Sequence, residues 1–142
     1  MKRIALLTLF ALLSLSAFAQ FDPCAQAPKI KVAINQTTGT KLISGVAGSK
    51  VYICHFHLVT ASAQNIALVE GTGTVCATGT AGVAGGTTAA TGWNFAANGG
   101  LVLGTGGNSV LQADAASGDD ICLLQSGAGQ VSGSISYIRS VQ

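Results

Sequence analysis

The sequence predicts an all-β chain that forms a single-domain antiparallel β-sandwich of jelly-roll type with long Gly/Thr-rich loops. Three observations support this fold class: short apolar segments with a period of two, glycine-rich segments between them, and no convincing amphipathic helix. We expect about eight short strands at spacings of roughly a dozen residues, which is typical of sandwiches and barrels. An up-and-down barrel is the alternative architecture.

Residues 1–19 have the pattern of a secretory signal peptide. Lys2 and Arg3 give a positive start, an apolar segment follows, and Ala-Phe-Ala at 17–19 matches the small-residue site that signal peptidase cuts. The apolar segment is shorter than the roughly 18 residues of a membrane span. We therefore expect a mature domain at 20–142 that is not inserted in a membrane. Its expected location is secreted, either extracellular or periplasmic.

Loss of the signal peptide leaves a protein with no formal net charge. The chain has seven Lys and Arg residues against five Asp and Glu residues, and two of the seven lie in the signal peptide. Nucleic acids and anionic membranes are bound by clustered positive charge, so neither is expected as a partner. Charged residues make up 8% of the chain, against about 25% in ordinary proteins. Copies of such a surface repel each other weakly, so we expect a homo-oligomer, with a neutral monomer as the alternative.

All four cysteines lie in the mature region, and an even number in an exported chain favours two disulfides. A zinc site is the rival interpretation, but no pair has the close C-x-x-C spacing of structural zinc modules. The sequence allows three pairings. Our prediction joins the two cysteines expected on strands, Cys54 with Cys122, and leaves Cys24 with Cys76.

The first half of the mature chain contains three predicted strands. In residues 29–36 apolar and polar side chains alternate, as in a half-buried strand. Residues 51–59 form a strongly apolar strand, and residues 65–71 are its expected hairpin partner across the turn between them. From Gly71 to Thr91 the chain is mostly Gly, Thr and Ala, which is too poor in large side chains to form core. We expect this segment to be a long surface excursion.

The second half begins with the clearest local signal. Apolar residues alternate on both sides of Asn98-Gly99, a pair that accepts the positive φ of a tight turn, so residues 93–103 are predicted to form a hairpin. Strands are also expected in residues 109–112 and 119–126. In the last segment, 130–141, apolar residues and serines alternate, so one face is buried and the serine face is solvated.

The segment VYICHFHLV, residues 51–59, contains both histidines of the chain. On a strand, His55 and His57 project from the same face, roughly 7 Å apart, and such a pair can hold two positions of a metal. A metal needs at least one more ligand, and there is no third histidine and only one glutamate, Glu70. The opposite face, with Tyr52, Cys54, Phe56 and Leu58, suits a core. We therefore expect the histidines on the outer face or at an interface between subunits, with metal binding as the minor alternative.

Motifs of the common catalytic classes are absent from the sequence. There is no G-x-S-x-G nucleophile elbow, no GK[ST] phosphate loop and no complete G-x-G-x-x-G fingerprint. Asp119 and Asp120 form the only acidic pair, but adjacent strand residues point to opposite faces, which does not suit shared acid and base work. We interpret them as a solvated turn. The protein is expected not to be an enzyme and to need no cofactor.

Trp93 is the only tryptophan. A single tryptophan in a small sandwich most often fills the core. The alternative is an exposed indole that stacks on a sugar ring, in which case Trp93 is a ligand-binding residue.

Four segments together carry a family resemblance: VYICHFHLV, NIALVEGTGTVCATGT, GWNFAANGGL and ICLLQSGAGQVSGSISY. The chain resembles a family of small, Gly/Thr-rich, cysteine-containing proteins of tailed phages, prophages and environmental bacteria. Its members are mostly uncharacterised or described as phage or virion structural proteins. The resemblance covers nearly all of the mature chain from about Cys24. It carries over no catalytic residues, and a secretion signal is unusual for a capsid component, which assembles in the cytoplasm.

These observations lead to two functional hypotheses of different classes. The first is a non-enzymatic, exported structural protein, a self-associating sandwich subunit or a decoration on a surface or virion. The alternative is an extracellular module that binds a glycan or small ligand through Trp93 and the loops of residues 71–91. The low charge, the cysteine number and the absence of catalytic motifs favour the first.

Overall fold

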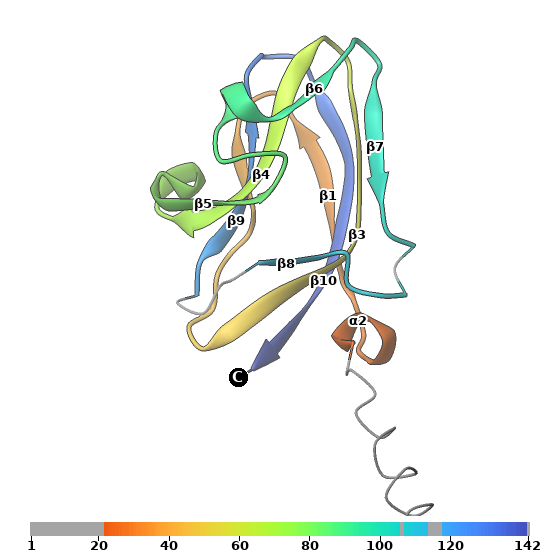
Figure 1. The fold of residues 1–142 in the computed structure, drawn as a ribbon, viewed down its shortest axis with the longest axis vertical. Helices are drawn as coiled ribbons and strands as arrows, with labels where there is room; N and C mark the ends of the chain where they lie inside the picture. Colours follow the sequence, from red (N-terminus) through yellow and green to blue (C-terminus); the bar gives the residue numbers. More distant parts are fainter. Residues whose placement is uncertain (1–21, 106, 114–117, 142) are drawn as a thin grey trace, which may run out of the picture.

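The computed structural model describes residues 22–105, 107–113 and 118–141, which form two antiparallel sheets packed face to face (Figure 1). Sheet A has the order β1 (Ile30–Gln36), β10 (Val131–Val141), β3 (Ser49–Thr60), β7 (Gly100–Leu103), and β8 (Leu111–Ala113) also pairs with β3. Sheet B has the order β2 (Thr40–Ile43), β9 (Asp120–Gln125), β4 (Gln64–Thr72), β5 (Thr78–Ala84), and β6 (Trp93–Phe95) also pairs with β4. The helical segments are short: α2 (Pro23–Gln26), η2 (Thr74–Cys76) and η3 (Ala89–Thr91). The predicted all-β sandwich is confirmed, whereas the signal peptide at 1–19 lies outside the described residues.

The core lies between the two sheets and consists of inward-facing residues from both. Its largest fully buried side chains include Phe56 and Leu58 of sheet A and Leu68 and Leu123 of sheet B. On β10 the predicted alternation is confirmed on the core side, since Val131, Ile135 and Tyr137 face the core. The prediction that the serine face is solvated is wrong at Ser134, which is buried, and beyond it Ile138 is buried on the outer side beside Cys24. Because each sheet buries one face against the other, strands such as β10 carry the period of two seen in the sequence. No helix among the described residues has the length and apolar character needed to cross a membrane.

Both predicted hairpins are wrong, because their turns connect the two sheets. β3 belongs to sheet A and β4 to sheet B, and likewise β7 belongs to sheet A and β6 to sheet B. Asn98 has the positive φ of 60° that the turn prediction required. Its backbone N–H, however, donates to the carbonyl of Thr60 at the end of β3, so the turn caps a corner of the sandwich. Turn residues fix the local reversal of the chain, but they do not decide which strands form hydrogen bonds.

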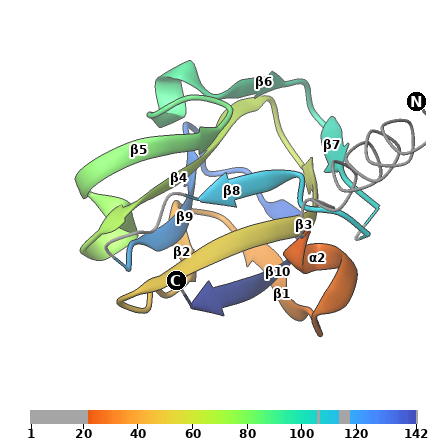
Figure 2. The ribbon, with the colours of Figure 1, turned by 60° about the horizontal axis from the view of Figure 1, so that its bottom comes forward.

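The segment from Gly71 to Thr91, expected to be a surface excursion, contains a strand of sheet B. Its β5 pairs antiparallel with β4 and lies at the margin of the sheet (Figure 2). Most of its side chains are exposed, as the composition predicted. The prediction missed the strand because Gly, Ala and Thr carry no period-two signal, and the hydrogen bonds of the backbone to β4 form without large side chains.

A β-bulge in β3 changes which of its residues face the core. The register with β10 shifts between Ser136 and Tyr137, where Cys54 is the extra residue of β3. Core residues are therefore Val51 and Ile53 before the bulge and Phe56 and Leu58 after it. The prediction that Tyr52 and Cys54 share the core face with Phe56 is wrong. These two side chains lie on the outer face of sheet A, in a cluster with Cys24 and Ile138.

The structure contains two disulfides, Cys24–Cys54 and Cys76–Cys122, with Cα atoms 5.5 Å and 6.0 Å apart. The predicted pairing of Cys54 with Cys122 and Cys24 with Cys76 is wrong. Cys54 points away from the core on sheet A, and Cys122 packs with Ala67 and Val69 on the opposite outer side of the sandwich, on sheet B. Cys54 instead cross-links the α2 segment to the outer face of sheet A, and Cys122 cross-links the η2 segment to the outer face of sheet B.

Asp22 fixes the helix α2 to the loop between β7 and β8. Its carboxylate caps the helix by accepting the backbone N–H of Cys24 at 2.9 Å. It also accepts hydrogen bonds from the backbone N–H of Ser109 at 2.9 Å and from the Ser109 hydroxyl at 2.7 Å. Hydrogen bonds from Ser109 lower the pKa of Asp22 below its ordinary value. Together with the Cys24–Cys54 disulfide, this contact holds the start of the described chain against sheet A.

We predict that Phe56→Ala strongly destabilises the fold. Phe56 is fully buried between the sheets, and truncation of such a side chain costs about 3–5 kcal/mol through lost burial and the resulting cavity. Val46→Ala is the control, because Val46 is 47% exposed and should change the unfolding free energy by less than about 0.5 kcal/mol. Urea unfolding of both variants measures the difference. Similar losses for the two would contradict the assignment of Phe56 to the core.

We also predict that Asp22 makes the stability depend on pH. The lowered pKa in the folded state means that the carboxylate contributes stability above its ordinary value of 3.8, and that this contribution is lost as the pH falls through the folded-state pKa. Asp22→Asn should lower the melting temperature at pH 7, and the difference from wild type should shrink at pH 3. Ser109→Ala removes one donor and should give an intermediate loss at pH 7. Equal differences at both pH values would contradict the role of the carboxylate.

Candidate functional site

Three places in the structure bear on function: the histidine pair on sheet A, the surroundings of Trp93, and a shallow pocket beside sheet B. The histidines lie on β3 directly after the bulge, in the middle of a strand that pairs with β10 along its whole length. Both point to the outer face of sheet A and are half-buried. The prediction of outward-facing histidines thus agrees with the structure.

The two imidazole rings lie next to each other. Their centroids are 5.0 Å apart and the ring planes are inclined by 51°. The Nδ1 atom of His57 lies 3.4 Å from the hydroxyl oxygen of Ser134, its partner on β10. Within the described residues, no third His, Cys, Asp or Glu lies close enough to form a metal-binding group with the pair. A single copy of this part of the chain therefore supplies two nitrogen ligands.

Trp93 lies on β6 and packs against the core, which matches the core interpretation. Its indole is nearly parallel to the ring of Phe56, with centroids 6.2 Å apart. The backbone of Gly85 also packs against the indole, so closely that a Cβ added there would lie 2.7 Å from Cδ2 of Trp93. The ring is half-buried, with much of its surface in contact with the protein. Sugar binding by Trp93 stays a prediction, and this packing does not favour it.

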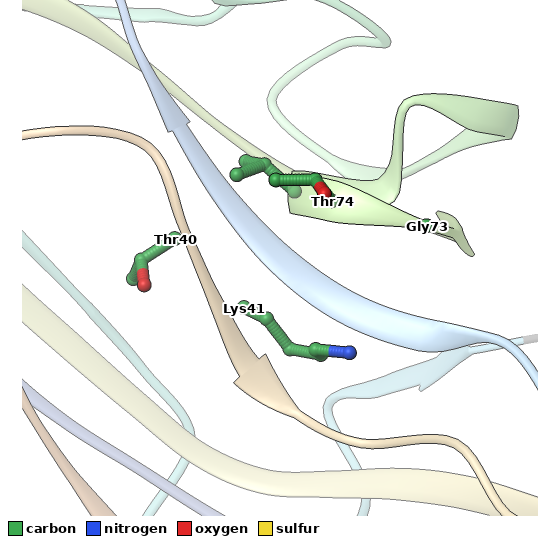
Figure 3. Close-up of a pocket in the computed structure, with 5 residues that line it drawn as sticks. Thr40, Lys41, Gly73 and Thr74 are labelled. Carbon is green, nitrogen blue, oxygen red and sulfur yellow. The ribbon is translucent and has the colours of Figure 1, made fainter.

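A pocket of about 470 Å³ lies between β2 and the segment that leads into η2 (Figure 3). Its lining consists of Thr40, Lys41, Gly73, Thr74 and Val75. The pocket uses part of the Gly/Thr-rich segment 71–91, as the ligand-binding hypothesis expected, but Trp93 is not among the lining residues. Sequence reasoning missed Thr40 and Lys41, because only the pairing of β2 with β9 brings them beside residues 73–75.

The charge of Lys41 is balanced at the edge of this pocket. Its Nζ lies 2.8 Å from Oδ2 of Asp120, and Oδ1 of Asp120 accepts the backbone N–H of Gly45 at 2.8 Å. The hydrogen bond from Lys41, followed by that from Gly45, lowers the pKa of Asp120. Asp120 is therefore a structural partner at the start of β9, whereas the sequence suggested a solvated turn. Since the ion pair neutralises Lys41, the pocket suits a neutral, hydroxyl-bearing ligand better than an anion.

The backbone beside the pocket is strained. Val75 and Cys76 have φ values of 53° and 55°, in the left-handed region that non-glycine residues rarely occupy. For a β-branched residue such as Val75 this conformation is costly and persists only where surrounding contacts impose it. Here the disulfide to Cys122 and the packing of Val75 on the outer face of sheet B impose it. The pocket wall is thus held in one shape.

Comparison of the chain with protein-family models, with curated proteins and with solved structures gave no match in any of the three.

Proposed function

We propose that the protein is a non-enzymatic, exported structural protein, a β-sandwich subunit that associates with copies of itself or decorates a surface or particle. The observation that carries this proposal is the edge strand β5, which lies at the margin of sheet B without any charged residue or proline. The chain has none of either between Glu70 and Asp114. An edge strand presents unpaired backbone N–H and C=O groups, which can pair with a strand of another chain.

The other edges of the sandwich differ from β5 in ways that discourage such pairing. β1 carries Lys31 and is preceded by Pro28, and β2 carries Lys41. β6, β7 and β8 are strands of three or four residues. β5 has seven residues, and its register against β4 shifts twice, between Leu68 and Val69 and between Glu70 and Thr72. Charged side chains, proline, short length and bulges are the usual means of blocking an edge, and of these β5 has only the irregular register.

The architecture and the disulfides are compatible with this role. Consecutive strands β1 to β4 alternate between the sheets, and the orders β1-β10-β3-β7 and β2-β9-β4-β5 support our inference of a jelly roll, a fold used by capsid proteins and by lectins. Two disulfides favour an oxidising compartment, in line with the expected secretion to the periplasm or beyond. The resemblance to phage and virion structural proteins agrees with a particle or surface role. Fold alone does not decide between assembly and binding.

We predict that Thr78→Lys weakens self-association. Thr78 is exposed on β5, and a lysine on an edge strand disfavours pairing with a strand of another chain, because pairing would cover the charged side chain. Thr38→Lys is the matched control, because Thr38 is exposed in the turn between β1 and β2, away from β5. Light scattering after size exclusion should give a defined oligomer for wild type and the control, and a smaller species for Thr78→Lys. A wild-type protein that stays monomeric at high concentration would rule out the assembly role.

A second candidate function is binding of a neutral glycan in the pocket of Thr40 and Thr74. The rigid wall at Val75 and the neutralised Lys41 favour it. We predict that Thr74→Val and Thr40→Val, which remove hydroxyls at constant shape, each weaken glycan binding about 5–10-fold, as expected for a lost hydrogen bond of about 1–1.5 kcal/mol. Thr38→Val should have no effect. A glycan array followed by titration measures this, and the absence of any saturable signal would exclude a glycan-binding function.

A further inference from the structure

We propose that His55 and His57 form half of a zinc site that a second copy of the chain completes. The first argument is where the pair lies. Sheet A buries its inner face against sheet B, and the α2 segment covers its outer face at Cys54. The half-buried histidines lie on this outer face directly beyond the α2 segment, on β3 between β10 and β7 (Figure 1). Because Phe56 and Leu58 face the core, the alternation of the strand places both histidines on that outer face, two residues apart and after the bulge at Cys54.

The second argument is the distance between the rings. Zinc binds imidazole nitrogen at about 2.0–2.1 Å, and the ring centre lies about 1.2 Å behind the nitrogen, so two imidazoles on one tetrahedral zinc have centroids roughly 5 Å apart. The observed separation is 5.0 Å. The rings are inclined by 51° and not stacked flat. The separation of the rings is therefore compatible with two ligands of one ion.

The third argument is the contact between His57 and Ser134. A histidine that binds zinc through Nε2 usually donates its Nδ1–H to an oxygen, which fixes the tautomer and the ring orientation. The Ser134 hydroxyl lies 3.4 Å from Nδ1 of His57, and Ser134 is only 4% exposed, so this oxygen is held in place by its surroundings. Ser136 occupies the matching position on β10 opposite His55. We assign Ser134 as a positioning residue for the zinc ligand.

The fourth argument is that the site needs another chain. Zinc takes four ligands in a structural site. In the described part of the chain no third His, Cys, Asp or Glu completes a metal-binding group with the pair, and the adjacent Cys54 is bound in the disulfide to Cys24. A two-fold axis through the ion would place the same two histidines of a second copy opposite the first pair. The result is a tetrahedral site with four nitrogen ligands, to which each copy contributes His55 and His57.

The surface around the pair fits a second copy. On β10 the neighbouring positions are the small residues Ser134 and Ser136, and on β1 they are Ala33 beside Ser134 and the exposed Lys31 beside Ser136. The small residues let another sheet approach closely at His57, and a second copy has to accommodate Lys31 beyond His55. Val102 lies opposite His57 on β7 and is 69% exposed, and Val59 on β3 is 50% exposed. Two exposed valines beside the histidines would be buried by such a contact, which adds an apolar contribution to the metal bonds.

This interface is on sheet A and does not use β5, so it does not rest on the edge pairing proposed above. The zinc-dependent interface and the edge pairing of β5 can therefore be disproved independently of each other. In Thr78→Lys the edge pairing should be lost while the zinc-dependent pairing is retained.

Zinc titration of the untagged protein, first stripped with a chelator, tests the proposal. We expect saturable binding at one zinc per two chains by calorimetry, and a doubling of the solution mass by light scattering, in both wild type and Thr78→Lys. Addition of excess chelator should reverse the doubling. No saturable binding would overturn the proposal, and so would one zinc per chain without a change in mass.

Variants separate the zinc site from a general effect on the surface. His55→Ala and His57→Ala should each abolish the zinc-dependent doubling, whereas Ser132→Ala, on the same face but away from the pair, should leave it unchanged. Ser134→Ala should weaken zinc binding about 10–100-fold, the usual effect of losing an outer-shell partner. If a histidine variant does not fold, Ser134→Ala still decides, because full affinity in that variant would contradict the assigned geometry. Zinc-dependent doubling that persists without either histidine would overturn the site.

Discussion

The pairing of β3 with β10, including the bulge at Cys54, is the constraint on which the rest of the structure depends. Without the extra residue, the alternation of β3 would place Cys54 and Phe56 on the same face, as a regular strand requires. The bulge instead lets Ile53 and Phe56 both enter the core. It also turns Cys54 outward to meet Cys24. One irregularity thus determines which residues of β3 enter the core and which cysteine Cys54 can reach.

The two disulfides show how a chain with few charges and many small residues holds its loops. Neither bond crosses the core. Cys24–Cys54 ties the helix α2 to the outside of sheet A, and Cys76–Cys122 ties the segment of η2 to the outside of sheet B. Burial between the sheets stabilises the sandwich, and the cross-links fix the covering segments, which contain too little apolar surface to pack firmly by themselves. The rigid wall at Val75 follows from the second of these bonds.

The same composition bears on the proposed contacts with other copies. Few side chains carry charge, so long-range repulsion is weak, and recognition must come from backbone edges, exposed valines or metal ligands. The edge of β5 and the face of His55 and His57 supply such features on different sheets. A subunit with two separate self-contact surfaces can form chains or layers, whereas either surface alone gives only a dimer if it is two-fold symmetric.

The sequence alone determined the fold class, because period-two alternation in segments such as β10 follows directly from a sheet with one buried face. It also determined that the histidines share a face, since this depends only on local geometry, whereas for Trp93 it favoured the core and left an exposed position as the alternative. It could not give the disulfide pairing, because the bulge at Cys54 is created by the register with β10 and leaves no mark in residues 51–59.

The sequence also could not show whether the turn at Asn98 joins two paired strands or connects the two sheets, since turn residues fix a reversal of the chain but not the strands that pair. The pocket of Thr40 and Thr74 was decided by tertiary structure alone, because packing of the η2 segment beside β2 and β9 joins residues that are far apart in the chain.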